Sequence, residues 1–209
     1  LGVYACRILV PGMSDIYPVE DLLLANNTMG AHLREIILAL PSLEWDAEQY
    51  KELLQQLGEE GHTERTRVRE LLGIAAAKGT ALHTLRVGEL KAMLALAAGE
   101  LESALDLIDW TMEFNQSVFP ADRANYYRAL RACVELFLDE ERDPEQYRPV
   151  FARMFGEETL AEAWAHARGE ARFHGLEAAD LSLSQFPLHQ KLLAAYEKLQ
   201  KAKRIHTWN

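Results

Sequence analysis

The sequence has few cysteines, no long apolar run and no excess of positive charge. Cys6 and Cys133 are the only cysteines in 209 residues. They are too few and too far apart for a disulfide framework, which favours a reducing, cytoplasmic location. No apolar stretch approaches the ~20 residues that a membrane-spanning helix needs, so we expect no membrane contact. The net charge of −10 argues against nucleic-acid binding, because phosphate contacts need a cationic surface.

Recognisable catalytic motifs are missing as well. The seven histidines are scattered and none belongs to an HExxH pattern, and two cysteines alone cannot build a structural zinc site. There is no Gly-rich phosphate loop, and the serines at 182 and 184 lack the flanking glycines of a nucleophile elbow. We therefore expect no catalytic, cofactor-binding or metal-binding residue, and no enzyme activity, in this chain alone.

The sequence does contain one candidate β-strand, at residues 3–10. These residues are aliphatic and aromatic, and Pro11-Gly12 ends the run. No comparable strand follows, and a lone strand leaves its backbone N–H and C=O groups unpaired. The chain also opens on Leu1 rather than Met. We therefore interpret residues 1–17 as the terminal strand and linker of an upstream α/β domain, and residues 18–209 as an α-helical domain.

Apolar residues recur at helical spacing over most of residues 18–209. A first helix is expected from Pro18 to Leu40, weakened in its middle by Asn26, Asn27 and Gly30. Start and stop residues predict further helices, about nine in total, over 49–57, 63–79, 84–98, 101–112, 120–138, 144–155, 160–167 and 186–205. Residues 170–184 are expected to form a long loop. The last helix is expected to bury a stripe of Leu188, Leu192, Leu193, Tyr196 and Leu199.

Residues 99–105, Gly-Glu-Leu-Glu-Ser-Ala-Leu, resemble the turn and second-helix start of a tetratricopeptide repeat. In that motif a glycine ends the first helix, and a small alanine lets the second helix pack closely. The resemblance covers one repeat, roughly 85–120. It predicts an all-α fold of antiparallel helix pairs, tetratricopeptide-repeat-like. A plain α-helical bundle with a glycine turn is the alternative.

A second resemblance covers the whole chain. Residues 6–22 resemble the closing segment of the catalytic-type domain of YcaO proteins, and residues 67–73, 88–97, 110–115 and 123–128 are similar to the C-terminal extension of bacterial members. The resemblance implies a parent protein that binds ATP and magnesium through its upstream domain. It also implies that the parent assists the radical enzyme RimO in methylthiolating an aspartate of a small-subunit ribosomal protein.

Two departures from the family pattern limit what can be carried over. No segment of this chain matches the ATP-site motifs, which are clustered glutamates and basic residues of the upstream domain. Members that form azoline rings end in a proline-rich tail, whereas this chain ends at Asn209 without one. The resemblance therefore assigns no catalytic residue to this chain, and cyclodehydratase chemistry in the parent is in doubt.

One helix carries a candidate partner-binding strip, made of Arg123, Asn125, Arg128 and Arg131. Asn125 and Arg128 are three residues apart, so their side chains share a helix face. In tetratricopeptide domains the first helix of each pair lines a concave groove, where Asn and basic side chains can hold a peptide carboxylate. The alternative is an exposed helix face whose arginines form ion pairs with acidic neighbours.

These observations predict a non-catalytic interaction or stabilising module of a YcaO-type accessory factor for ribosomal-protein aspartate methylthiolation. Its expected partner is RimO or the small-subunit ribosomal protein. Two alternatives stay open. Residues around Arg7, Ser14 or Glu20 could complete the ATP site of the upstream domain, or the helices could serve only to hold a homodimer together.

Overall fold

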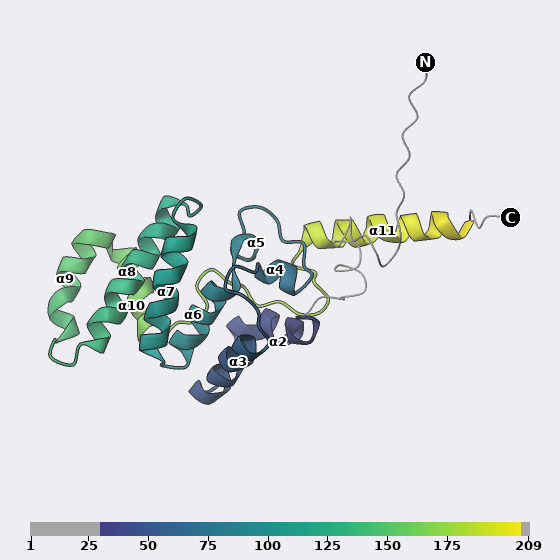
Figure 1. Ribbon diagram of the computed structural model, residues 1–209. Helices are drawn as coiled ribbons and strands as arrows, with labels where there is room; N and C mark the ends of the chain where they lie inside the picture. The colour runs from purple at the N-terminus through teal and green to yellow at the C-terminus, as the bar shows by residue number, and fades with distance from the viewer. Residues whose placement is uncertain (1–29, 206–209) are drawn as a thin grey trace, which may run out of the picture.

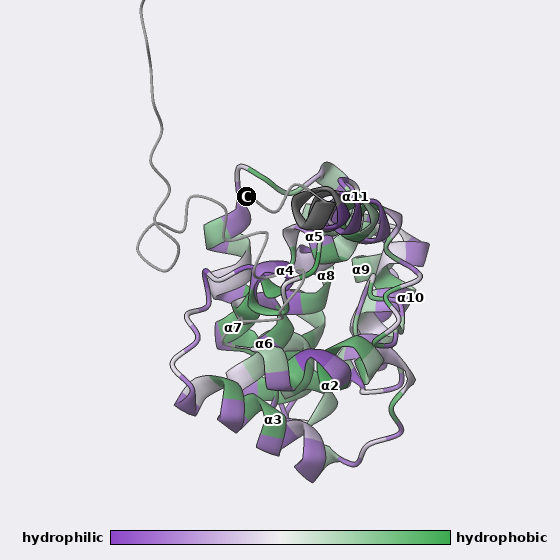
Figure 2. Cartoon of the chain, turned by 90° about the vertical axis from the view of Figure 1, so that its right-hand side faces the viewer, coloured by the Kyte–Doolittle hydropathy of each residue, from purple (hydrophilic) through white to green (hydrophobic). Residues whose placement is uncertain are grey.

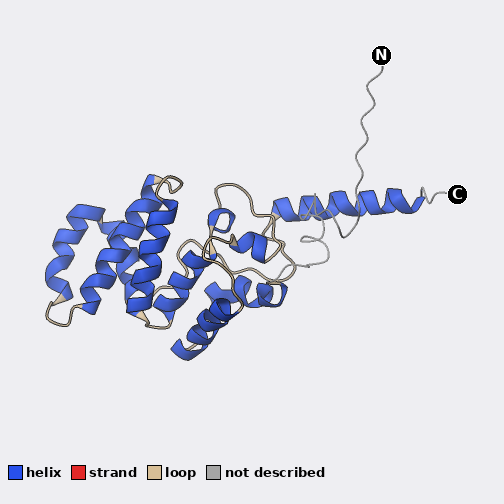
Figure 3. Ribbon diagram, in the orientation of Figure 1, coloured by secondary structure: helices blue, strands red, loops and turns tan. Residues whose placement is uncertain are grey.

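Every regular element that the structure describes is a helix (Figure 3). The computed structural model describes residues 30–205. Its elements are η1 (Ala31–Leu33), α2 (Arg34–Ala39), η2 (Leu40–Ser42), α3 (Ala47–Glu59), α4 (Val68–Leu71), α5 (Ala81–Thr84), α6 (Val87–Ala97), α7 (Leu101–Asn115), α8 (Ala121–Leu138), α9 (Pro144–Phe155), α10 (Glu157–Ala167) and α11 (Pro187–Ile205). The all-α prediction is confirmed for this range. The predicted strand at 3–10 and the domain boundary at residue 17 lie outside it.

Helix α3 and the helices from α6 to α10 follow one another in space much as they do in sequence (Figure 1). α3 packs against α6, α6 against α7, α7 against α8, and α8 against α10, while α9 packs against both α8 and α10. Between α6 and α7 the chain reverses at Gly99, which has a φ of 74°. That left-handed conformation favours glycine, and the predicted glycine break between two antiparallel helices is confirmed.

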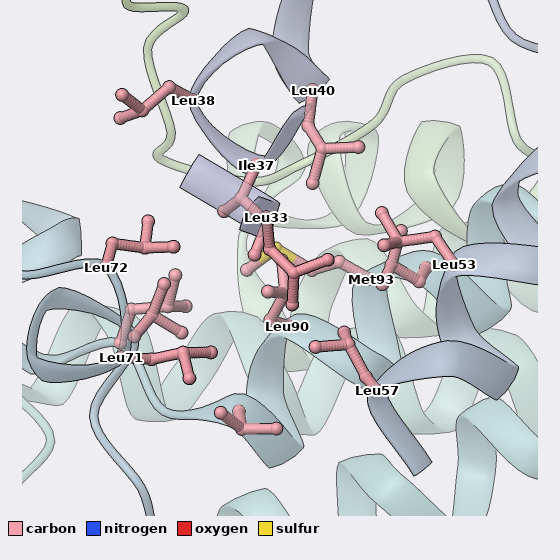
Figure 4. Close-up of a cluster of buried hydrophobic side chains, with 14 of the residues drawn as sticks. Leu33, Ile37, Leu38, Leu40, Leu53, Leu57, Leu71, Leu72, Leu90 and Met93 are labelled. Carbon is pink, nitrogen blue, oxygen red and sulfur yellow. The ribbon is translucent and has the colours of Figure 1, made fainter. Parts of the chain in front are cut away.

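Helix α6 divides two hydrophobic clusters. One cluster gathers around η1, α2, α3 and α4, and the side chains of Leu33, Leu57 and Leu90 point toward one another in Figure 4. The other gathers between α6, α7, α8 and α10. Ten of the eleven α6 residues are buried, because a helix that is covered on all sides has no solvent face. By contrast, α3 is hydrophobic toward α6 and hydrophilic on its outer side (Figure 2).

Two helix starts follow the capping chemistry of the sequence. Asp46 accepts a hydrogen bond from the backbone N–H of Gln49, whose side chain accepts one from the backbone N–H of Asp46. This reciprocal pair is a capping box. Asp143 caps α9, with Pro144 in the first helical position. The helices predicted over 49–57 and 144–155 therefore begin within two residues of their expected positions.

The predicted helix over 63–79 is wrong. Only the four residues of α4 are helical there, and the chain turns away at Gly73, which has a φ of 64°. Arg34 stabilises this turn by donating side-chain hydrogen bonds to the carbonyls of Leu72 and Gly73. The helix predicted over 49–57 also runs further than expected, to Glu59, and the left-handed residue that follows it is Gly61.

The last helix begins at Pro187 after a long irregular segment, as predicted. Its expected buried stripe is wrong at Leu188 and Leu192, whereas Leu193 and Tyr196 are half-buried. The side chains of Leu188 and Leu192 are 42% and 38% exposed. The first turn of α11 is hydrogen-bonded to Ala75 and Ser182, and the rest of the helix projects away from the other described helices (Figure 1). Helical spacing predicts that these leucines share a face, but it does not show whether anything covers that face.

Candidate partner-binding groove

The four residues of the predicted strip reach different parts of the domain. The Arg123 guanidinium donates to the hydroxyl of Thr84 at 2.8 Å and forms an ion pair with Glu89. The Asn125 side chain donates to the carbonyl of Phe155 at 2.7 Å. These two side chains therefore connect α8 to α5, α6 and the end of α9, rather than lying free on the surface.

The two remaining arginines differ from each other. Arg131 forms ion pairs with Asp109 on α7 and with Glu135 on its own helix. This matches the alternative interpretation, an exposed face in ion pairs with acidic neighbours. Arg128 is exposed, and it has no ion-pair partner among residues 30–205. Partner binding by this strip stays a prediction. Within the described residues, Arg128 is the member of the strip whose charge is free to bind a partner.

Arg123 belongs to a buried polar cluster that the sequence analysis did not identify. Glu89 is fully buried in α6 and accepts hydrogen bonds from the Tyr127 hydroxyl and from Arg123. Burial, together with the nearby Glu89 charge, holds the pKa of Tyr127 well above its usual value. Burial alone would lower the pKa of Arg123, but the Glu89 carboxylate raises it. The cluster therefore contains a charged arginine and a protonated tyrosine, both hydrogen-bonded to the side chain of Glu89.

An open polar cleft of about 810 Å³ lies beside this cluster. It is bordered by the first turns of α8, by the start of α10, by α5 and by the loop at residues 174–175. Its lining includes the carboxylates of Asp122, Glu158 and Glu162. Asp122 and Glu158 are exposed, and within the described part of the chain neither has an ion-pair partner. The cleft therefore presents uncompensated negative charge.

A second, mainly apolar cleft of about 530 Å³ continues from the first. The two clefts share the residues at 79–81 and Gly175. The apolar cleft is lined mainly by aliphatic and aromatic residues, which include Ile37, Leu38, Leu82, Leu85, Leu176 and Phe186. We call the two clefts together the groove. It offers apolar contacts at one end and carboxylates at the other.

Aromatic and histidine side chains fix the loop that separates the two clefts. The His174 ring stacks on Tyr126 with ring centroids 3.6 Å apart, and its Nδ1 lies 2.7 Å from Glu162. The buried His166 ring meets both rings edge-on and lies 2.8 Å from the Glu162 carbonyl. These contacts fix the position of the loop relative to α10, so the shape of the groove depends on them.

Two buried histidines predict a pH dependence of stability. Burial lowers the pKa of both His166 and His189. The nearby positive charge of Arg34 lowers the pKa of His189 further. Below about pH 6.5 the unfolded chain takes up protons that the folded chain does not. Stability is therefore complete above that pH and falls below it, by up to about 1.4 kcal/mol per pH unit for each histidine. Urea unfolding at pH 7.5 and 5.5 measures the difference.

The control for this prediction is the double variant His166→Asn, His189→Asn. It removes both titrating rings but keeps a side-chain oxygen able to accept the Ala75 N–H bond that His189 now accepts. Carboxylates with lowered pKa values, such as Glu64, lose their charge at lower pH and lie outside this window. An equal loss of stability in the variant and the parent would contradict the assignment to these histidines.

The chemistry of the groove suits a cationic ligand better than a nucleotide. Three carboxylates would repel a polyphosphate, and the guanidinium of Arg123 is already paired with Glu89. Across the described residues, no three His, Cys, Asp or Glu side chains gather as a metal site would require. Cys133 is buried, which raises its pKa to about 12, so it is not a reactive thiolate.

Fold and site together define an all-α domain of consecutively packed helices with a long open groove. The chain belongs to the YcaO family: residues 30–205 match the model of the YcaO cyclodehydratase C-terminal domain. It is 59% identical, over 203 residues, to the ribosomal protein S12 methylthiotransferase accessory factor YcaO of Escherichia coli. It is 55% identical, over 205 residues, to an uncharacterized protein of Haemophilus influenzae.

These alignments cover 97% and 98% of this chain but only 35% of each relative. The chain therefore spans about a third of the length of the curated relatives it matches. The resemblance to YcaO proteins is confirmed, whereas the ATP and magnesium sites that it implies upstream stay a prediction. None of the helices between residues 30 and 205 has the length and apolar character that crossing a membrane requires.

Proposed function

We propose that this chain is a non-catalytic docking module of an accessory factor for ribosomal-protein methylthiolation. In this proposal the groove holds a basic segment of the protein to be modified, ribosomal protein S12, which the name of the Escherichia coli relative contains. ATP and magnesium chemistry would belong to sequence upstream of this chain. The observation that carries the proposal is the uncompensated negative charge at the polar end of the groove.

Charge complementarity favours this partner. Ribosomal proteins contact RNA phosphates and therefore carry cationic surfaces. Asp122 and Glu158 are available to such a surface because no described cation neutralises them, and the whole chain has a net charge of −10. Complementary charges steer association and fix the orientation of the bound partner. The acidic cleft would thus select a lysine- or arginine-containing segment.

The apolar cleft would supply a different part of the binding energy. Aliphatic side chains of Leu82 and Leu176 and the ring of Phe186 border it. A peptide with apolar residues next to its basic residues could bury them there, which removes apolar surface from water. The order of the two clefts along the groove would set the direction in which the peptide lies.

The test compares two variants with the same change in net charge. Asp122→Asn with Glu158→Gln neutralises the polar cleft, while Glu140→Gln with Glu141→Gln neutralises two exposed glutamates after α8. The cleft variant is expected to bind purified S12 about tenfold more weakly by calorimetry, since each exposed charge pair contributes up to about 1 kcal/mol. The control variant should bind S12 as tightly as the unsubstituted chain does.

Three outcomes would contradict this assignment. Absence of S12 binding to the parent chain would exclude the partner, and RimO would then be tested in the same assay. An equal loss in both variants would indicate attraction to the overall charge rather than binding in the groove. Weaker binding by Arg128→Ala with Arg131→Ala, while the cleft variant binds normally, would place the partner on the arginine strip.

A further inference from the structure

Helix α11 is attached to the described domain only near its beginning. The Nδ1 atom of His189 accepts a hydrogen bond from the backbone N–H of Ala75, and the Gln190 side chain donates one to the carbonyl of Ser182. Beyond these contacts the helix extends away from α4 and α5, as the views in Figures 1 and 2 agree. Most of its length therefore lies beside none of the described helices.

An apolar stripe runs along this projecting helix. Leu188, Leu192 and Ala195 are exposed and are spaced four and three residues apart, which places them on one helix face. A helix of a globular protein normally turns such a stripe toward a partner. The stripe is therefore a candidate docking surface, and the charges around it limit which segment can bind there.

Basic residues border the stripe and disfavour a second copy of the same helix. Lys191, Lys198 and Lys201 are exposed on α11. Two such helices side by side would bring like charges together, whereas an acidic, apolar segment would be attracted. The stripe is also short, while stable interfaces between proteins bury about 800 Å² on each partner. A segment that is already tethered nearby needs far less area to bind.

We propose that residues 16–24 of the same chain dock on the α11 stripe. Their sequence, Ile-Tyr-Pro-Val-Glu-Asp-Leu-Leu-Leu, combines apolar residues with two adjacent acids. It therefore matches the stripe in apolar character and opposes it in charge. The sequence also predicts a helix from Pro18, which would present the apolar residues on one side.

The described chain starts at the base of α11, which places this segment within reach. A side chain on Gly30 would collide with Leu71, so Gly30 lies directly on α4. From the next helix, Arg34 binds the carbonyls that follow α4, and the adjoining Ala75 is bonded to His189 of α11. Residue 30 and the first turn of α11 therefore contact the same short stretch of backbone.

The length of the tether is sufficient. The five residues between Leu24 and Gly30 can span up to roughly 18 Å when extended. The stripe from Leu188 to Ala195 is about 10 Å long, at 1.5 Å per helical residue. The segment can thus reach the stripe within one molecule, and the tether gives it a high effective concentration there.

Cysteine pairs in the full 209-residue chain test the proposal. With Cys6→Ser as background, Leu192→Cys is combined with Leu22→Cys or with Leu23→Cys. The matched control moves the α11 cysteine to position 197, which is exposed and lies about 140° around the helix. Under mild oxidation, at least one stripe pair is expected to form an intramolecular disulfide tenfold faster than its control, as measured by peptide mass mapping.

Two results would overturn the proposal. Equal rates for the stripe and control pairs would show no preferred contact, and disulfide-linked dimers through position 192 would show that a second copy occupies the stripe. A second measurement needs no cross-link: Leu22→Asp with Leu23→Asp should accelerate amide hydrogen exchange in residues 192–198 about tenfold, because uncovered helices fray. Unchanged exchange would also refute the docking.

Discussion

Replacing Arg123 by alanine is expected to lower the free energy of unfolding by about 3–5 kcal/mol. The change removes the cation that pairs with Glu89, a carboxylate with no exposed surface, and leaves that charge buried. It also removes the hydrogen bond to Thr84 and the packing of the guanidinium on Phe119. For a domain of this size the melting temperature should fall by about 10 °C, which thermal unfolding followed by circular dichroism measures.

Arg128→Ala is the matched control for this prediction. Arg128 lies on the same helix but is exposed and has no described ion-pair partner, so its loss should change stability by no more than about 0.5 kcal/mol. Adding Glu89→Gln to Arg123→Ala should recover part of the lost stability, because it removes the stranded charge. Similar melting temperatures for the two single variants would contradict a structural role for the Arg123–Glu89 pair.

Tyr50→Ala is expected to lower the free energy of unfolding by about 3–5 kcal/mol. It is also expected to weaken the proposed binding of S12 in the groove. Tyr50 is fully buried in α3, and its hydroxyl donates to the carbonyl of Leu43. The Phe173 ring and the Arg172 guanidinium both lie against its ring. Removing the ring therefore releases the loop that carries His174 and Gly175 into the groove wall.

Tyr50→Phe separates the two contributions of this residue. It keeps the ring contacts to Phe173 and Arg172 but loses both hydrogen bonds of the hydroxyl, the one donated to the Leu43 carbonyl and the one accepted from Arg172. This loss should cost about 1–2 kcal/mol. Urea unfolding and S12 binding are measured on both variants. Tyr50→Ala should lose both stability and affinity for S12, whereas Tyr50→Phe should lose only the smaller amount of stability and keep its affinity for S12. Normal S12 binding by a folded Tyr50→Ala would show that the groove does not depend on this anchor.

The sequence predicts those features that depend on neighbouring residues. The cap at Asp46, the proline start at 144 and the turn at Gly99 each follow from local backbone chemistry, and the structure contains all three. The helix predicted over 63–79 is wrong because contacts with residues far away in the sequence determine the conformation there. Its apolar residues have helical spacing, but long-range contacts from Arg34 and from the backbone of Leu85 hold that stretch in turns.

The groove and the buried cluster could not be predicted in this way. The groove combines α5, α8, α10 and a loop near residue 175, which are far apart in sequence. One local signal for the cluster was present: Glu89 is an acid within the strongly apolar run of α6. An acid in that position requires a buried partner, but the sequence does not show that the partner is Arg123, 34 residues later.

The position of α6 between two clusters has a consequence for how this domain can be divided. Leu90 and Leu94 face the first cluster, while Ala92 and Ala95 face the second. Whichever fragment retained α6 would leave the other with an open apolar wall. The domain therefore has no suitable point at which it could be cut to half its helices. The helices around both clusters must be inherited, exchanged or engineered as one unit.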